Sequence, residues 1–198
     1  MRVASINLAP LSSLRELESV NLKSNELTEI DLGPIYECIK LKMLILADNK
    51  LSAVNLSPIA RCGSLEALDL SQNEIGTIDL SPLAGCTNLR WLYLSNNQIL
   101  AVDLTPLERC TKLQYLVLSD NKISRIRLTP LKRCRNLRYV LLNGNSLSMV
   151  NISPLFNAMQ LEHLVVDDST VVVANSKLQH RDYFPRPIEE MMDRITWV

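Results

Sequence analysis

The side chains with the strongest potential for chemistry in this chain are five cysteines at one fixed interval. They are Cys38, Cys62, Cys86, Cys110 and Cys134, so each position number exceeds the one before it by 24. Thiols can ligate a metal or form disulfides, but metal sites place cysteines in close pairs or beside histidine. An odd cysteine count, with no signal-peptide-like start, is typical of a reducing compartment. The pattern therefore predicts thiols packed in the core of a cytoplasmic protein, with no metal and no cofactor.

The two histidines give little support for catalysis. His163 and His180 stand outside any recognisable nucleophile motif, and five glycines form no phosphate-binding loop. His163 lies close in sequence to Asp167 and Asp168, a weak pattern for a metal site, and contact surface is the preferred interpretation. We therefore expect a protein that is not an enzyme.

Asparagine and proline follow the same interval as cysteine, which shows that the chain is built from repeated units. The unit that begins at Leu89 reads Leu-x-x-Leu-x-Leu-x-x-Asn-x-Ile and ends at Cys110. The repeated asparagines are Asn25, Asn49, Asn73, Asn97, Asn121 and Asn145. Each stands where a strand turns, a position in which an amide can satisfy backbone groups.

This unit resembles the signature of the leucine-rich repeat family, and it recurs from Leu17 to about Val166. The resemblance implies an α/β solenoid, a curved right-handed horseshoe with a parallel sheet on its concave face and short helices on its convex side. It also implies that the asparagines form a ladder. The expected organisation is a partial N-terminal repeat or cap over 1–16, six leucine-rich repeats with the interval of 24 over 17–160, and a last strand with an atypical cap over 161–198.

Local patterns predict the remaining elements of each unit. Thr105-Pro106 and its equivalents favour a side-chain cap followed by proline at the first helical position. The alternation over 102–104 predicts a second extended stretch. Beyond the repeats, we expect a strand over 171–173 and a helix after Pro187 that carries Ile188, Met191, Met192 and Ile195 on one side.

Candidate binding residues are the strand positions that alternate with the buried leucines. They project from the face opposite the core, and Trp91, Tyr115, Tyr139 and His163 are expected to form one aromatic column, because adjacent strands lie ~4.8 Å apart. Cross-strand stacking would explain part of this pattern, but a contiguous apolar surface favours binding. The candidates are Met43, Ile45, Asp69, Trp91, Tyr93, Tyr115, Val117, Tyr139, Leu141 and His163.

Charge and hydropathy narrow the classes of partner. Lys plus Arg and Asp plus Glu each number 21, and the apolar runs fall short of the ~20 residues that span a bilayer, so we expect neither a nucleic-acid nor a membrane partner. A local cluster of basic residues is best interpreted as a solvated face. It comprises Lys122, Arg125, Arg127, Lys132, Arg133, Arg135 and Arg138.

The leading hypothesis is a non-enzymatic module that binds a protein or peptide on its concave aromatic and apolar face. Two alternatives stay open: a regulatory or sensor domain of a larger enzyme or GTPase-linked protein, and a structural scaffold. The sequence leaves the oligomeric state undetermined, since a symmetric dimer would also cover such a face.

Overall fold

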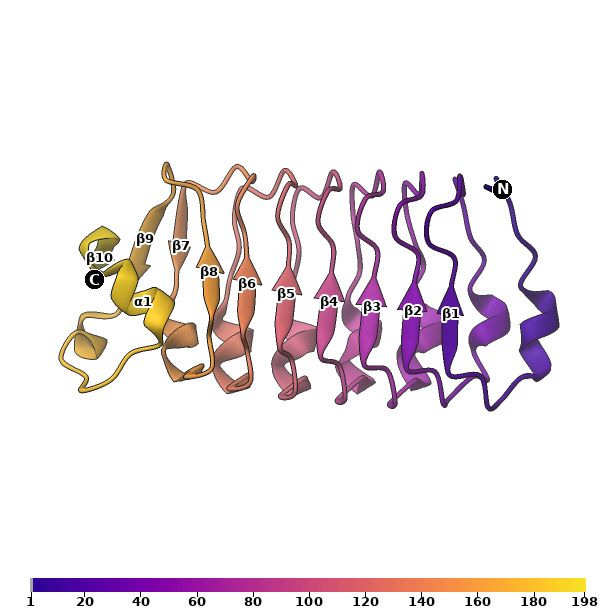
Figure 1. Cartoon of the computed structure of the whole chain (residues 1–198), viewed down its shortest axis with the longest axis horizontal. Helices are drawn as coiled ribbons and strands as arrows, with labels where there is room; N and C mark the ends of the chain where they lie inside the picture. The colour runs from indigo at the N-terminus through magenta and orange to yellow at the C-terminus, as the bar shows by residue number, and fades with distance from the viewer. Residues whose placement is uncertain (1) are drawn as a thin grey trace.

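The computed structural model describes residues 2–198, which stack into a solenoid (Figure 1). Its main sheet is parallel, with seven strands in the order β1-β2-β3-β4-β5-β6-β8. Each strand pairs with the next at an offset of one repeat, so that Leu92 lies opposite Leu68 on one side and Leu116 on the other. The strands are β1 (Ser19–Asn21), β2 (Met43–Ile45), β3 (Ala67–Asp69), β4 (Trp91–Tyr93), β5 (Tyr115–Val117), β6 (Tyr139–Leu141) and β8 (His163–Val165).

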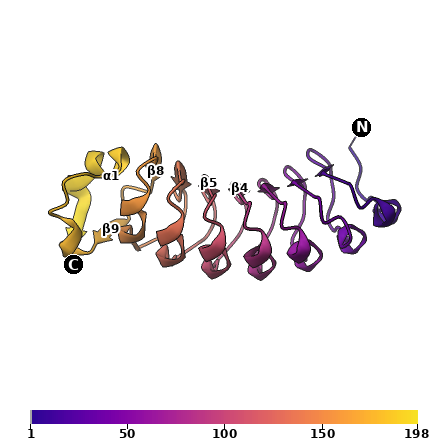
Figure 2. The ribbon, with the colours of Figure 1, turned by 90° about the horizontal axis from the view of Figure 1, so that it is seen from below.

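Short 3₁₀ helices lie on the outer side of a shallow arc, and the strands lie on its inner side (Figure 2). This arrangement confirms the predicted solenoid with a concave sheet. Each helix is very short, because proline near its start favours the first turn and the chain must then return to the next strand. The helices of the repeats are η1 (Ala9–Ser13), η2 (Gly33–Ile35), η3 (Ser57–Arg61), η4 (Ser81–Gly85), η5 (Thr105–Arg109), η6 (Thr129–Arg133) and η7 (Ser153–Asn157).

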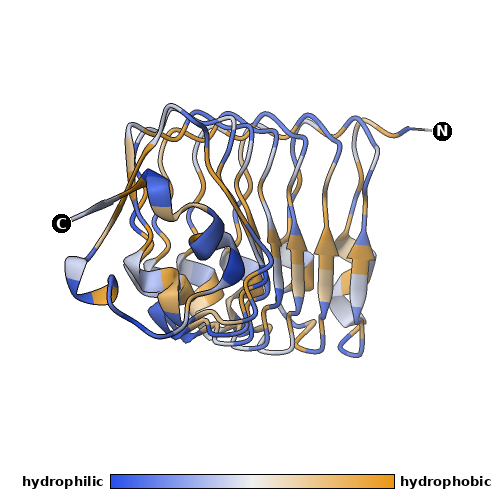
Figure 3. Cartoon of the chain, turned by 60° about the vertical axis from the view of Figure 1, so that its left-hand side comes forward, coloured by the Kyte–Doolittle hydropathy of each residue, from blue (hydrophilic) through white to orange (hydrophobic). Residues whose placement is uncertain are grey.

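The core fills the space between the strands and the short helices. In one coil Leu92, Leu94, Leu107 and Cys110 are all fully buried, and their equivalents in neighbouring coils stack on them. Figure 3 shows hydrophobic residues concentrated along the strands. All five cysteines are free and buried, and burial raises the pKa of the Cys110 thiol to about 11. The prediction of thiols packed in a core is therefore confirmed.

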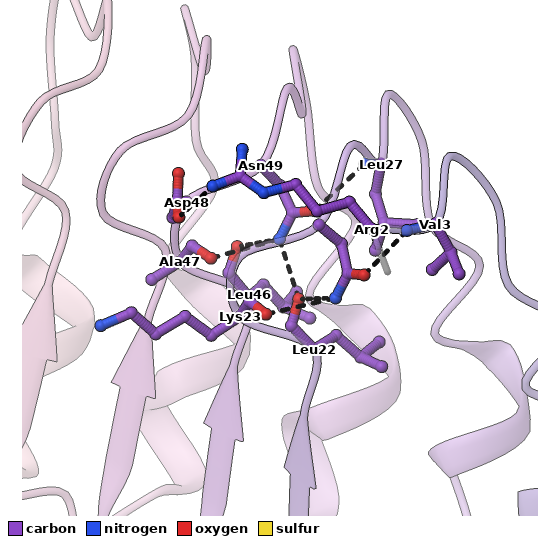
Figure 4. Close-up of polar contacts among 10 residues, drawn as sticks. Arg2, Val3, Leu22, Lys23, Leu27, Leu46, Ala47, Asp48 and Asn49 are labelled. Atoms are coloured by element: carbon purple, nitrogen blue, oxygen red, sulfur yellow. Dashed lines mark hydrogen bonds and ion pairs between the residues drawn. The ribbon is translucent and has the colours of Figure 1, made fainter.

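The asparagines form the ladder that the resemblance implied. Figure 4 shows the amide of Asn49 donating to the carbonyls of Leu22, Leu46 and Ala47, at 3.0, 3.0 and 3.2 Å. Its oxygen accepts from the backbone N–H of Leu27 at 3.0 Å. One side chain thus satisfies backbone groups of two successive coils, which explains why the same residue type recurs at this position.

The residue before each ladder asparagine adopts the left-handed conformation. From the first turn to the last the φ angles are positive, at 54° to 67°, for Ser24, Asp48, Gln72, Asn96, Asp120 and Gly144. Asp, Asn and Gly tolerate this conformation better than most residues. At Gly144 a Cβ atom would also meet the carboxylate and the backbone of Asp120, so glycine fits this position without displacing that residue.

One local prediction for the repeat was wrong in detail. Thr105 is not the helix cap: Leu104 takes the N-cap position, and the Thr105 hydroxyl donates to Asp103 Oδ1 at 2.6 Å. The same carboxylate accepts from the Thr105 backbone N–H at 2.9 Å, which makes the turn an Asx turn. The extended stretch over 102–104 alternates between exposed and buried residues as expected, but its equivalent forms a strand in the last coil, where β7 (Met149–Asn151) finds a partner.

The C-terminal segment closes the solenoid with a second sheet, in the order β10-β9-β7. The predicted strand appears as β9 (Val171–Ala174), and the predicted helix is shorter than expected, as α1 (Arg186–Glu190). Ile195 lies beyond that helix, in β10 (Ile195–Trp197), so the expected single apolar helix face is replaced by helix, turn and strand. Two short helices complete the cap, η8 (Ser176–Leu178) and η9 (Met192–Arg194). Ile188, Met191 and Ile195 are nevertheless buried.

Phe156 anchors this cap. It occupies the slot of Ala84 and Lys132 in earlier coils, where the side chain faces outward, yet it is 1% exposed. The rings of Phe184 and Trp197 meet it edge to face, at centroid distances of 5.8 and 6.1 Å. One aromatic residue on η7 thus joins the repeats to the terminal segment.

Candidate functional site

The candidate site is the concave face of the main sheet, which is open to solvent (Figure 1). Parallel sheets are usually covered on both faces, but here the short helices cover only the convex side. Strand side chains alternate, so Leu92 points into the core while Trp91 and Tyr93 point outward. Two outward positions per strand therefore produce two parallel columns along the solenoid. We call these two columns from β2 to β8 the concave strip.

Three aromatic rings form a continuous stack within the concave strip. Tyr115 and Tyr139 lie 4.6 Å apart with their planes within 8°, and Tyr139 and His163 lie 4.7 Å apart at 24°. Tyr93 joins from the second column, 6.3 Å from Tyr115 and tilted by 44°. Such pairs contribute ~0.5–1.5 kcal/mol each beyond their burial. The stack holds these rings in fixed orientations on the open face.

Trp91 departs from the predicted aromatic column. Its backbone pairs with Tyr115 in the sheet, but within residues 2–198 its ring makes no stacking contact with Tyr115. The guanidinium of Arg90 instead lies 6.0 Å from the centre of the indole. The predicted column of four rings is therefore a stack of three, extended sideways by Tyr93.

The other predicted site residues also lie on the concave strip, at different depths. Met43 is 44% exposed, whereas Val117 is only 9% exposed. Ile45, Asp69 and Leu141 are half-buried. Asp69 accepts hydrogen bonds from the backbone N–H and the hydroxyl of Ser71, at 2.9 and 2.6 Å, so its carboxylate stabilises the end of its own strand.

Val165 belongs to the strip and was missing from the predicted set. It pairs with Leu141 in the sheet and is 38% exposed. Its position in the outward column was sufficient to identify it. The apolar surface therefore continues to the last strand of the sheet.

A column of charged residues flanks the aromatic stack, one position before each strand. Its signs alternate over the first four coils, Gln114 is uncharged, and a cation and an anion follow; inspection of the sequence at the repeat interval could have found this column. The members are Glu18, Lys42, Glu66, Arg90, Gln114, Arg138 and Glu162. Lys42 pairs with Glu18 at 2.6 Å, and Arg90 Nε lies 3.4 Å from Glu66. Ion pairs between coils thus form one edge of the concave strip.

The pair of Arg138 with Glu162 is coupled to the aromatic stack. Hydrogen bonding to Arg138 lowers the pKa of the Glu162 carboxyl. The Tyr139 hydroxyl also donates to Glu162, which raises the pKa of that phenol. Burial raises the pKa of Tyr93, with Tyr115 and Asp69 adding to the effect. At neutral pH the strip therefore presents neutral phenols beside a charged pair.

The acidic residues near His163 are engaged in the fold. Asp167 accepts from the backbone N–H groups of Gly144 and Asn145, at 2.9 and 3.2 Å, and Asp168 pairs with Arg194 at 3.3 Å. Within residues 2–198 the structure shows no group of three or more His, Cys, Asp or Glu side chains that could hold a metal ion. In the same residues no helix has the length and apolar character needed to cross a bilayer.

A family model described as leucine-rich repeat matches residues 15–75, 39–99 and 87–147. The chain belongs to the leucine-rich repeat family. Proteins with this fold are typically protein–protein interaction modules, and the family is generally non-enzymatic. No curated protein sequence matches this leucine-rich repeat chain.

Several solved structures resemble this leucine-rich repeat chain. An internalin from Listeria monocytogenes is 29% identical over 84% of this chain and 52% of its own, with a TM-score of 0.64. The chain thus spans about half the length of that protein. Internalin C2 from the same organism is 35% identical over 79% of this chain and 74% of its own, with a TM-score of 0.54. A plant peptide hormone receptor, solved in complex with RGF2, is 22% identical over 81% of this chain and 26% of its own, with a TM-score of 0.71, and shows the fold alone.

Proposed function

We propose that this protein is a non-enzymatic recognition module that holds a protein or peptide partner on the concave strip. The observation that carries the proposal is the in-register row of aromatic and apolar side chains on a sheet face that the fold leaves open. Contiguous apolar surface of this kind marks interaction sites, and Trp and Tyr are favoured anchors in them.

The geometry of the strip supports this function. Stacking between Tyr115 and Tyr139, at 4.6 Å, limits the rotation of both rings before a partner arrives. Pre-ordered side chains lose less conformational entropy on binding, so more of the interaction energy is available for affinity. The Arg138 and Glu162 pair adds charged groups at the edge, as expected for a polar rim around an apolar centre.

The comparisons support a binding role at the level of the family. The leucine-rich repeat fold is typical of interaction modules, and one solved structure with this fold is a plant peptide hormone receptor in complex with RGF2. The partner of the present chain and the face it contacts are part of our proposal.

An affinity capture experiment with matched variants tests the concave strip. The test variant carries Trp91→Ala, Tyr115→Ala and Tyr139→Ala. The control variant carries Tyr36→Ala, Ile39→Ala and Leu100→Ala, which removes similar apolar area from side chains that are 45–59% exposed outside the sheet. Both variants are first checked for folding by circular dichroism.

The proposal predicts a captured protein that wild type and control retain and that the test variant loses. The captured protein is then purified, and its affinity for each variant is measured by calorimetry. Equal affinities for wild type and test variant would show that the strip is not the binding surface. If the test variant has a lower melting temperature but captures the same proteins as wild type, the result would favour the scaffold role.

We also propose that the protein works in the cytoplasm, where thiols stay reduced. Five buried free cysteines, each one repeat from the next, support this location. Thiol labelling of protein unfolded directly from its native source measures the free cysteines. Recovery of disulfide-bonded cysteine would contradict the proposal.

A further inference from the structure

A second surface with a distinct character lies on the convex side near the C-terminal end. Three hollows of about 440, 570 and 450 Å³ all include Asn157 in their lining, so they lie side by side. Their walls come from η6, η7 and the cap segment around η8. We call these three adjoining hollows the convex groove.

Five cations line the convex groove. Lys132, Arg133 and Arg135 come from the η6 region, and Lys177 and Arg181 come from the cap. Glu108 is the one acidic residue that lines the same three hollows within residues 2–198. The groove therefore carries a local excess of positive charge, although the whole chain has a net charge of +0.

The cations of the convex groove differ from Arg61, a cation at an equivalent convex position of an earlier coil. Arg61 on η3 occupies the same slot as Arg133 and lies 3.6 Å from Glu37, its equivalent in the preceding coil. The equivalent of Arg133 in its own preceding coil is Arg109, so like charges follow one another there. Among residues 2–198, none of the five groove cations takes part in an ion pair. Placing unpaired like charges together is unfavourable in the free protein, and an anionic partner would relieve it.

The cap orders part of the convex groove. Arg181 is half-buried and donates through Nη1 to the carbonyl of Phe156 at 2.9 Å, which leaves most of its five N–H donors available. Phe156, Pro154 and Leu178 form apolar lining beside these donors. A guanidinium fixed in this way favours bidentate contacts with carboxylates.

We propose that the convex groove binds an acidic peptide segment whose carboxylates contact the five cations and whose apolar side chains contact the lining of Pro154 and Leu178. Single-stranded nucleic acid fits less well, because such sites use exposed aromatic rings to stack bases and the one aromatic lining residue within residues 2–198, Phe156, is buried. The proposal is independent of the concave strip, since the two surfaces lie on opposite faces.

A binding experiment on the whole chain tests this surface. The probe is a fluorescein-labelled peptide in which leucine alternates with pairs of glutamate, and the control probe carries glutamine in place of each glutamate. The test variant is Lys132→Glu with Arg133→Glu. The matched control, Arg15→Glu with Lys40→Glu, makes the same charge change at exposed positions far from the groove.

We expect the acidic peptide to bind wild type and control alike, and to bind the test variant more than about tenfold more weakly, because charge reversal places like charges in contact. Affinity should also fall as salt concentration rises. Equal binding of the glutamine peptide, equal binding by the test variant, or absence of binding to wild type would each overturn the proposal.

Two further arms separate the competing explanations. Tighter binding of an oligothymidylate than of the acidic peptide would assign the groove to nucleic acid and overturn the peptide proposal. Loss of peptide binding in the Trp91→Ala, Tyr115→Ala, Tyr139→Ala variant, with the charge-reversed variant unaffected, would place the peptide on the concave strip and likewise overturn it. Retained binding in the aromatic variant supports the convex groove and leaves the concave proposal to its own test.

Discussion

Tyr93 and Asn97 lie close together in the same coil, and both belong to columns with the same interval, yet only one column keeps its residue type. Asn97 donates to the carbonyls of Leu70 and Leu94 at 3.0 and 3.1 Å, and these backbone groups are present in every coil whatever the sequence. The column of Tyr93 faces solvent and holds Asp69, Val117 and Leu141 elsewhere. Buried columns are therefore constrained by neighbouring coils, while the concave strip is free of that constraint.

The largest expected effect concerns the cysteine column, whose five members are all buried. Burial raises the thiol pKa to about 11 for Cys62 and about 12 for Cys86 and Cys134, from 9.0 in the unfolded chain. Unfolded protein therefore loses protons first as pH rises above 9, and stability falls through the window up to the folded pKa. Each thiol contributes ~1.4 kcal/mol per pH unit, so several together should unfold the protein cooperatively in alkali.

Circular dichroism during an alkaline titration, with reductant present, measures this effect. The variant Cys86→Ala with Cys134→Ala should show a shallower loss of stability with pH, even if its stability at neutral pH is lower. An unchanged slope in this variant would show that thiol ionisation does not drive the transition.

The second test removes one member of the asparagine ladder. Asn97→Ala leaves the buried Ile75 N–H without its acceptor, at ~1–3 kcal/mol. The Leu70 and Leu94 carbonyls each lose one of two asparagine donors, because Asn73 still donates to Leu70 and Asn121 still donates to Leu94. We expect the free energy of unfolding to fall by about 2 kcal/mol in urea denaturation. Asn96→Gly is the matched control, because glycine tolerates the φ of 54° at the neighbouring position. Similar losses in both variants would contradict the ladder's role.

The third test compares adjacent residues of β5 that point in opposite directions. Leu116 is fully buried, and Leu116→Ala should cost about 3 kcal/mol through lost packing. Tyr115→Ala should cost only about 1 kcal/mol, from lost contacts with Tyr93 and Tyr139. Thermal and urea unfolding of the two variants measures the stability that each one loses. A larger loss for Tyr115→Ala would make the aromatic stack primarily structural.

The smallest expected effect concerns the charged edge of the strip. The pKa of Glu162 is below its ordinary 4.5 because Arg138 donates hydrogen bonds to it. Its contribution to stability is therefore present above pH 4.5 and is lost as pH falls through the lowered pKa. The melting temperature of Glu162→Gln should lie slightly below wild type at about pH 6 and should converge with it in stronger acid. A constant difference across this range would show that the carboxylate charge is not responsible.

The sequence predicted the structure best at positions where every coil has the same backbone environment and therefore the same residue type. The interval of leucine, asparagine and cysteine predicted the repeated unit and its buried positions. The resemblance of that unit to the leucine-rich repeat signature implied the solenoid and the parallel sheet on its concave face. Alternation along each strand then placed the candidate side chains on the face opposite the core.

Side-chain orientation and the terminal cap were beyond this kind of prediction. Trp91 shares a column with Tyr115, but its ring lies beside the Arg90 guanidinium. The orientation of the ring depends on the side-chain rotamer, which the spacing of residues does not determine. Phe156 occupies a slot that faces solvent in other coils and becomes buried because a non-repeated segment folds over it. The sequence analysis did not identify Asp103 as the hydrogen-bond acceptor at the start of η5. It assigned the helix cap to Thr105 because threonine before proline is a common capping pattern.

The in-register stacking of coils also determines how the molecule would respond to tension. Each coil contacts only its neighbours. A stretching force applied to the two ends of the chain would therefore act on every interface between coils. The hydrogen bonds between β4 and β5, for example, would break together, and the chain of one repeat would then extend by up to about 80 Å. Stretching from the two ends should therefore proceed in regular steps, each the length of one extended repeat.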